Sequence, residues 1–348
     1  MRLLILGTGG MAAAHAENFA NIDGVMLVAG VDTNPGNLGS FCDRFGISER
    51  FANLDDAIGW GEFDAACNVT PDAIHFPTTM ALLNAGKHVF CEKPLATNFA
   101  EADEMAKTAR AKGLANMVNL TYRNVSAIQS ARQIIADGKI GDIRHFEASY
   151  LQSWLTQPAW GDWKTETKWL WRLSTAHGSH GVLGDVGIHI LDFTRYATGL
   201  DVTEVSGRLK TFDKAPGGQI GDYVLDANDS FIMHVGTDRG AIGTIHASRF
   251  ASGHHNELRL RVWGTQGAVE VTNNGDLGSL RVCSEPDLES TTWHDVPLNA
   301  VETNYRKFAK AVLDGGPQDP DFAHAARLQA VLDGAIASDR NNGCGISI

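Results

Sequence analysis

The chain begins with Met1-Arg2-Leu3-Leu4-Ile5-Leu6-Gly7-Thr8-Gly9-Gly10-Met11-Ala12, and this stretch decides the fold. A short apolar run leads directly into a glycine-rich turn, after which the apolar residues follow a helical pattern. The order G-x-G-x-x-A between a strand and a helix is typical of a dinucleotide-binding turn, because its glycines permit a tight bend and a close approach of a pyrophosphate. The helix N-terminus adds N–H groups that attract phosphate. The residues expected to bind a dinucleotide are therefore Gly7, Thr8, Gly9, Gly10, Met11 and Ala12.

An acidic residue supports this interpretation. Asp32 ends the second predicted strand and is followed by Thr33, in the place where a carboxylate binds ribose hydroxyls. The alternative, a glycine-rich turn without a ligand, leaves this coincidence of strand, helix and acid unexplained. No Arg or Lys stands nearby to hold a 2′-phosphate, which Asp32 would repel, so NAD is favoured over NADP. An arginine from elsewhere in the fold could still reach that phosphate.

Residues 1–121 are predicted to form a doubly wound α/β domain with a parallel sheet. Short apolar runs alternate there with longer amphipathic stretches. The predicted strands are 3–6, 25–31, 65–69, 87–91 and 117–120, and the predicted helices are 11–20, 35–45, 78–84 and 99–112, the last with Thr97 or Asn98 as its N-cap.

Residues 122–348 are predicted to form an α+β domain. A helix over 125–137 precedes the strands 143–151, 202–211, 230–235, 241–248, 258–263 and 268–271, with a second helix between Val182 and Tyr196. The strands alternate apolar and polar residues, which indicates a sheet with one buried face. Two helices, 301–313 and 322–340, close the chain and could pack back on the first domain.

Composition excludes several classes of function. The 348 residues include 29 Lys and Arg against 41 Asp and Glu, a formal charge of −12 that disfavours nucleic acid and anionic membranes as partners. No apolar run approaches the roughly 20 residues of a membrane span, and the first apolar run meets a glycine turn rather than a signal-cleavage site. The five cysteines are scattered without a C-x-x-C pair, which indicates neither a disulfide framework nor a zinc ribbon. We expect a cytoplasmic protein.

Two further turns follow predicted strands. Thr70-Pro71 comes after the strand 65–69, and Glu92-Lys93-Pro94 comes after the strand 87–91. Ligands of open α/β sheets lie outside the carboxyl ends of strands, so both turns are expected to face the cofactor. Lys93 is either a surface lysine at a turn or a cation aimed at a reacting oxygen, and its position alone leaves both open.

At this point the sequence resembles the glucose–fructose oxidoreductase/inositol dehydrogenase (Gfo/Idh/MocA) family. The resemblance covers essentially the whole chain, and the combination of E-K-P with D-x-G-x-H is specific. Its motifs are Gly7-x-Gly9-x-x-Ala12 with His15, Thr70-Pro71 with His75, Ala85 to Pro94, Arg123, Trp171-Arg172, Gly184-Asp185-Val186-Gly187-Ile188-His189-Ile190-Leu191-Asp192, and the closing Ala335-Ile336-Ala337-Ser338.

The resemblance implies a Rossmann domain followed by a domain with an open, mainly antiparallel sheet, through which homodimers or homotetramers form. It also implies oxidation or reduction of sugars, inositols or related polyols with a pyridine nucleotide. The family's catalytic lysine, aspartate and histidine carry over to Lys93, Asp185 and His189. The residues expected around the cofactor are Thr70, Pro71, His75, Glu92, Lys93, Arg123, Trp171 and Arg172. One departure, His177 to Leu183 in place of the family's glycine run, leaves the substrate open.

The chemistry of the three residues agrees with these roles. Asp185 and His189 are four residues apart, so on a helix they would share a face. An imidazole can exchange the hydroxyl proton of a secondary alcohol, and Lys93 can stabilise the alkoxide. Asp185 would orient His189 or bind a neighbouring hydroxyl. The alternative is a helix cap and a core histidine; a metal site built on His177, His180, Asp185 and His189 lacks the usual ligand patterns, so no metal is expected.

Five tryptophans, Trp154, Trp160, Trp163, Trp169 and Trp171, are concentrated in one polar stretch. Indole faces suit the apolar faces of sugar rings, although the same rings could simply pack the interior. The expected substrate-binding residues are Lys93, Tyr122, Trp163, Arg172, Asp185 and His189. We therefore expect an NAD-dependent sugar or polyol dehydrogenase. An NADPH-dependent keto-sugar reductase and a catalytically silent nucleotide-binding sensor are the alternatives, and the presence of all three catalytic residues counts against the sensor.

Overall fold

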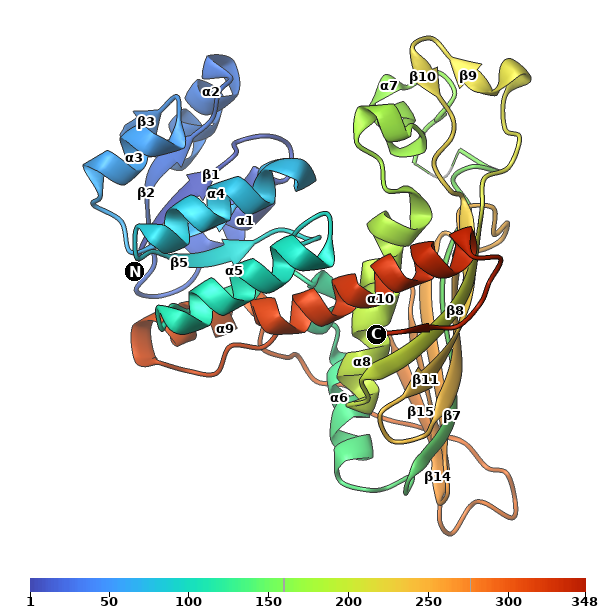
Figure 1. The fold of residues 1–348 in the computed structure, drawn as a ribbon. Coiled ribbons are helices and arrows are strands. Elements are labelled where there is room, and N and C mark those ends of the chain that lie inside the picture. The colour runs from blue at the N-terminus through green and yellow to red at the C-terminus, as the bar shows by residue number, and fades with distance from the viewer. Residues whose placement is uncertain (159, 276) are drawn as a thin grey trace. The chain divides into compact units, whose positions relative to one another are not determined.

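The computed structural model describes residues 1–158, 160–275 and 277–348, which form two compact units. The first unit comprises Met1–Leu120 and Glu302–Gln329, and the second comprises Thr121–Val301 and Ala330–Ile348. The long helix α10 (Phe322–Arg340) begins in the first unit and ends in the second (Figure 1). Among the described residues, no helix has both the length and the apolar character needed to cross a membrane.

The first unit contains a parallel sheet of six described strands in the order β3-β2-β1-β4-β5-β6. This order is that of a Rossmann fold, so the predicted doubly wound α/β architecture is confirmed. The strands are β1 (Arg2–Leu6), β2 (Met26–Val31), β3 (Glu49–Phe51), β4 (Ala65–Asn68), β5 (His88–Cys91) and β6 (Asn116–Val118). The helices are α1 (Ala12–Ala20), α2 (Pro35–Phe45), α3 (Leu54–Trp60), α4 (Asp72–Asn84), α5 (Phe99–Ala111) and α9 (Asn304–Asp314).

Two local differences from the prediction have physical reasons. Helix α4 begins at Asp72 instead of residue 78. Pro77 is the sixth residue of this helix and removes only one hydrogen bond near its start, so the helix continues through the proline. Strand β3 and helix α3 were not expected, since the strand has three residues and the helix seven, too short for a clear periodicity.

The core of the first unit includes a helix from the far end of the chain. Tyr305 and Phe308 of α9 pack edge to face against Phe19 of α1, with ring centroids 5.1 and 6.2 Å apart. Both also contact Phe90 of β5. Aromatic pairs of this kind add about 0.5–1.5 kcal/mol each beyond the area that they bury. Helix α9 therefore stabilises the unit that carries the glycine turn.

The second unit is built on a sheet of nine described strands in the order β16-β15-β14-β13-β7-β12-β11-β8-β17. Only the β7–β12 pair is parallel, so the expected mainly antiparallel sheet is confirmed. The strands are β7 (Ile143–Gln152), β8 (Val202–Lys210), β11 (Ser230–Thr237), β12 (Ile242–Ser248), β13 (Asn256–Gly264), β14 (Gly267–Asn273), β15 (Ser279–Ser284), β16 (His294–Asp295) and β17 (Ile346–Ser347), with a separate hairpin of β9 (Gln219–Ile220) and β10 (Tyr223–Val224).

Helices α6 (Ser126–Ala136) and α8 (Ile188–Thr198) pack against one face of this sheet (Figure 1). Strand β13 shows why: Leu258, Leu260 and Val262 are fully buried, while the intervening arginines lie on the opposite, more polar face. Short helical segments precede α8, namely α7 (Thr167–Leu170), two 3-10 turns over Trp171–Leu173 and Thr175–His177, and a π-helical turn over Leu183–Gly187. These segments position the side chains described next.

Candidate active site

The glycine turn after β1 has the shape that a dinucleotide requires. Gly7 has a φ of +83°, and a β-carbon there would lie 2.7 Å from the carbonyl oxygen of Val69, so only glycine fits. A β-carbon at Gly9 or Gly10 would meet no atom within 4 Å among the described residues. Ala12 is fully buried at the start of α1, and Met11 is exposed. The turn is therefore closed toward the sheet and open on its outer side, as a pyrophosphate would need.

Asp32 joins the end of β2 to this turn. Its Oδ2 atom accepts hydrogen bonds from the backbone N–H and the hydroxyl of Thr8, both 2.8 Å long. Its Oδ1 atom accepts a third from the N–H of Asn34, also 2.8 Å. Burial raises the pKa of Asp32, but these hydrogen bonds outweigh it and lower the pKa below its usual value. Asp32 is therefore an ionised carboxylate beside the exposed Thr33, and these residues fit the adenosine side of NAD.

His75 holds the two edge turns together. Its Nδ1 atom lies 2.6 Å from the carbonyl oxygen of Pro94, and its Nε2 atom lies 2.8 Å from that of Thr70. Burial lowers the pKa of His75, but the neighbouring Cys91 and the Pro94 carbonyl raise it to about 9. Two carbonyl partners also require two N–H groups, hence an imidazolium. His75 is fully buried, so it lies behind the turns that were expected to face the cofactor.

Glu92 anchors the turn that carries Lys93. Its Oε1 atom lies 2.9 Å from His15 Nε2 and accepts a 2.6 Å hydrogen bond from the Asn119 amide. Its Oε2 atom accepts the backbone N–H of Lys93, 3.1 Å away. Burial raises the pKa of Glu92, yet the contacts with His15, Asn119 and Lys93 prevail and lower it to about 2. The carboxylate thus fixes the backbone from which Lys93 projects.

This pKa predicts a pH dependence of stability. Because the folded-state pKa of Glu92 is about 2, below its usual 4.5, its stabilising contribution is complete above pH 4.5 and disappears as pH falls toward 2. Glu92→Gln should therefore reduce the acid-induced loss of unfolding free energy by an amount on the order of 1–3 kcal/mol. Urea unfolding of both proteins at pH 6 and pH 3 measures this difference.

The exposed Glu104 supplies the control for this experiment, since Glu104→Gln should leave the acid sensitivity as it is in the wild-type protein. If Glu92→Gln and Glu104→Gln lose stability equally between the two pH values, the ionised carboxylate of Glu92 does not stabilise the fold.

The second unit contains an open cavity of about 410 Å³, which polar, ionisable and aromatic side chains line. Three of the expected substrate-binding residues, Arg172, Asp185 and His189, line it together. Lys93 belongs to the first unit. The full lining consists of Tyr150, Gln152, Trp154, Trp160, Trp169, Arg172, Asp185, Val186, His189 and Asn256.

Asp185 and His189 reach the cavity from a distorted helix. Asp185 lies in the π-helical turn Leu183–Gly187, whereas His189 lies in the first turn of α8. A π-turn adds a residue per turn and occurs often at functional sites. The expected continuous α-helix is thus interrupted at the aspartate, although both side chains still line the same space.

The ring of Tyr122 supports His189. The two rings meet edge to face, with centroids 5.1 Å apart and an interplanar angle of 88°. The Tyr122 hydroxyl is hydrogen-bonded to that of Tyr150 and accepts a 3.2 Å bond from the Asn256 amide. Burial and the neighbouring Tyr122 raise the pKa of Tyr150 well above its usual value, so its hydroxyl stays protonated. Tyr150 and Asn256 were not singled out in the sequence.

Three indoles form one wall of the cavity, and they are only partly those expected. Trp169 lies between Trp154 and Trp160, with centroids 6.0 and 6.2 Å apart. Trp163 is not among the lining residues; it is buried, and its N–H donates to the carbonyl of Leu155. Trp171 is 40% exposed, and the guanidinium of Arg172 lies over its ring.

Arg123 also lies away from this cavity lining. Its buried guanidinium forms a bidentate ion pair with Asp192 of α8, with N···O distances of 2.7 and 2.9 Å, and stacks over Tyr196. Within the second unit it therefore ties the segment after Leu120 to helix α8. Among the described residues, no group of three or more His, Cys, Asp and Glu side chains could hold a metal ion.

Arg249 is the main residue of this region that the sequence analysis did not identify. Its guanidinium donates a 2.9 Å hydrogen bond to Oδ2 of Asp185, and Arg172 Nε lies 3.9 Å from the same oxygen. A signal for it exists in the sequence. Gly243, Ile245 and Ala247 alternate as the buried positions at the end of β12, and Arg249 continues that series, so an arginine occupies a core position.

Comparisons with known proteins agree with this geometry. Residues 1–120 match the family model of an oxidoreductase family with an NAD-binding Rossmann fold, and residues 128–270 match the GFO/IDH/MocA C-terminal domain. A levoglucosan dehydrogenase of Pseudarthrobacter phenanthrenivorans is 26% identical over 95% of this chain and 94% of its own. A myo-inositol 2-dehydrogenase of Thermotoga maritima is 26% identical over 78% of this chain and 75% of its own.

Among solved structures, an oxidoreductase domain protein from Kribbella flavida aligns with a TM-score of 0.87 and 28% identity. The alignment covers 100% of this chain and 99% of that one. The two matched models are the two parts of one domain arrangement and together span more than half of the chain. With the glycine turn, Asp32 and the Rossmann sheet, they establish that this chain belongs to the Gfo/Idh/MocA family of NAD-binding oxidoreductases.

Proposed function

We propose that the protein is an NAD-dependent dehydrogenase that interconverts a secondary alcohol and a ketone on a sugar, an inositol or a related polyol. The observation that carries this proposal is a single cavity lined by His189, Asp185 and three indoles. Similar chains named as levoglucosan and myo-inositol dehydrogenases support the substrate class.

The residues divide into those that would hold NAD and those that act on the alcohol. The glycine turn would hold the pyrophosphate, Asp32 and Thr33 the adenosine ribose, and the edge turns at Thr70-Pro71 and Glu92-Lys93 the nicotinamide side. The chemistry that bound NAD supplies is acceptance or donation of a hydride.

In the oxidation direction, His189 accepts the hydroxyl proton at a ring nitrogen while the carbon–hydrogen bond breaks. An imidazole suits this exchange because it titrates near neutral pH. The ammonium of Lys93 stabilises the negative charge that develops on the oxygen. Asp185 accepts a hydrogen bond from a neighbouring substrate hydroxyl and thereby orients the ring. In the reverse direction His189 returns the proton.

The polar and aromatic groups around the cavity suit a polyhydroxylated ring. Amide groups of Gln152 and Asn256 offer donors and acceptors for hydroxyls, and the indoles offer flat apolar faces. Arg172 and Arg249 both lie beside the carboxylate of Asp185, so two cations share one anion there.

We also propose that copies of the chain associate through the open face of the nine-stranded sheet as a homodimer or homotetramer. Ile232 of β11 and Ile242 of β12 are 54% and 61% exposed, although isoleucine is among the residues most often buried. Light scattering after size-exclusion chromatography measures the mass of the assembly.

The function is tested by nicotinamide reduction with purified protein across inositols, aldoses and 1,6-anhydro sugars, with NAD⁺ and NADP⁺ in parallel. We expect turnover with one substrate class at about 1–10³ s⁻¹ and a preference for NAD⁺. Tight NADH binding without turnover on any substrate would instead favour the nucleotide-binding sensor, and faster turnover with NADP⁺ would favour the keto-sugar reductase.

A further inference from the structure

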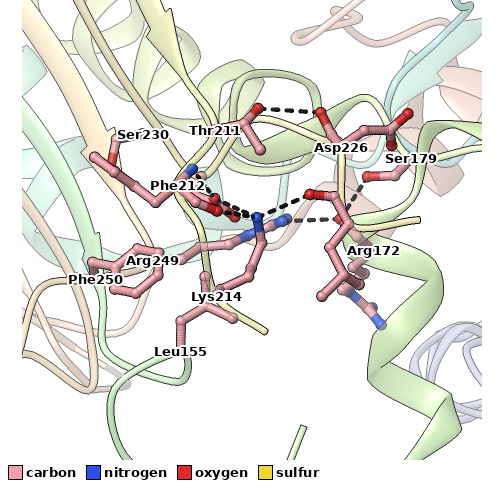
Figure 2. Close-up of polar contacts among 12 residues, drawn as sticks. Leu155, Arg172, Ser179, Thr211, Phe212, Lys214, Asp226, Ser230, Arg249 and Phe250 are labelled. Atoms are coloured by element: carbon pink, nitrogen blue, oxygen red, sulfur yellow. Dashed lines mark hydrogen bonds and ion pairs between the residues drawn. The ribbon is translucent and has the colours of Figure 1, made fainter. Parts of the chain in front are cut away.

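Arg249 carries a guanidinium that is completely buried next to the cavity. One terminal nitrogen donates to the carbonyl oxygen of Arg172, at 3.0 Å (Figure 2). The other donates to the carboxylate of Asp185, at 2.9 Å. The guanidinium also lies over the ring of Trp154, 5.1 Å from its centroid. All three of its partners contribute to the cavity lining, although Arg249 itself does not.

A buried ion pair between Lys214 and Asp229 lies next to the backbone of Arg249. Lys214 Nζ and Asp229 Oδ2 are 2.7 Å apart, and both side chains are at most 1% exposed. Lys214 also donates to the carbonyl oxygens of Phe212 and Leu225. The backbone carbonyl of Asp229 accepts the N–H of Arg249, at 2.9 Å. The ion pair thus fixes the residue that follows β12, from which the guanidinium projects.

The charges of this cluster balance. Burial lowers the pKa of Arg249, while the charges of Asp185 and Asp229 oppose that effect. Burial raises the pKa of Asp229, while Lys214 opposes it. Arg249, Lys214 and Asp229 are buried, whereas the Asp185 side chain is 32% exposed at the cavity. Removing one of the buried charges would leave its partner uncompensated.

Such a cluster is costly to bury, and apolar residues of similar volume often serve stability as well or better. The position of the cluster next to the cavity suggests that it serves substrate binding rather than stability. The guanidinium donates a hydrogen bond to Asp185, whose carboxylate lines the cavity. A charge-assisted hydrogen bond fixes the orientation of that carboxylate and stabilises its ionised form.

We propose that Arg249 is a positioning residue that fixes the Asp185 carboxylate for substrate binding, with the Lys214–Asp229 pair holding Arg249 in place. The inference rests on the proposed function, because it assigns Asp185 a contact with the substrate. Arg249 itself touches neither substrate nor NAD.

The test compares Arg249→Met, which keeps the length of the side chain without its charge, with Arg249→Lys, which keeps the charge but loses the forked geometry. We expect kcat/KM to fall about 10- to 100-fold in Arg249→Met and less in Arg249→Lys, as when an orienting partner is lost. The dissociation constant for NADH, which binds the first unit, should stay within about twofold of the wild-type value. The exposed Arg239 supplies the control variant, Arg239→Met, with unchanged kinetics.

A double-mutant cycle separates positioning from a general loss of structure. Because Arg249 acts through Asp185, adding Arg249→Met to Asp185→Asn should lower kcat/KM by less than about threefold more. Multiplicative losses in the double variant, or wild-type kcat/KM in both Arg249 variants, would overturn the inference. If Arg249→Met does not fold, the cycle is run with Arg249→Lys. Wild-type kcat/KM in Asp185→Asn alone would instead contradict the proposed role of Asp185.

Discussion

Replacing Lys93 with methionine should lower kcat by about 10²- to 10³-fold, the cost of removing one group that stabilises a developing oxyanion. Methionine keeps the unbranched side chain, while the cation disappears. The turn itself should survive, because it is held through the backbone. Glu92 accepts the Lys93 N–H, and His75 bonds the carbonyl of Pro94.

The measurement is steady-state oxidation of the best substrate, together with NADH binding by fluorescence. NADH affinity should change less than about threefold, since the proposed phosphate and ribose contacts are those of the glycine turn and Asp32. Lys112→Met replaces an exposed lysine of the same unit and should behave like the wild-type protein. Equal turnover in Lys93→Met and wild type would refute the catalytic assignment. A parallel loss of NADH affinity and turnover would make Lys93 a cofactor-binding residue instead.

The elements that the sequence predicts best are those with strong local signals at their ends. Helix α2 begins and ends where expected, because the Asn34 side chain caps its first N–H groups and Gly46 ends it in the left-handed conformation. Asn98 caps α5 in the same way. Strands β15 to β17 lack such signals. β16 and β17 are the two edge strands of the sheet and β15 lies next to β16, so the partner strand determines their structure more than the local pattern does.

The roles of the site residues could also be predicted only in part from the sequence. The D-x-G-x-H spacing located Asp185 and His189, but a motif does not say whether a residue touches a ligand or supports one that does. His75 and Arg123, both expected at the cofactor, use their polar atoms on neighbouring protein groups. Which tryptophans face the cavity depends on short irregular segments without a period, so Trp163 could not be separated from Trp169.

Replacing Asp32 with alanine should weaken the preference for NAD over NADP by about 10- to 100-fold in kcat/KM, the free energy typical of one hydrogen bond to a charged group. Two effects act in the same direction. The adenosine ribose loses a charged acceptor, which weakens NAD binding, and a 2′-phosphate no longer meets a carboxylate, which makes NADP more acceptable. The three hydrogen bonds from Thr8 and Asn34 hold that carboxylate ionised at the end of β2, so neither effect depends on a rare protonation state.

The experiment needs a second Asp32 variant and a control variant, because Asp32 also ties the glycine turn to β2. Asp32→Asn keeps an acceptor for Thr8 without the charge, so a loss of discrimination in both variants identifies charge as the cause. The exposed Asp23 gives the neutral control, Asp23→Ala. If Asp32→Asn discriminates as the wild type does while Asp32→Ala binds neither nucleotide, then Asp32 shapes the turn, and the selection of NAD comes from another residue. Because the ribose contact and the shape of the turn share one side chain, only this comparison separates them.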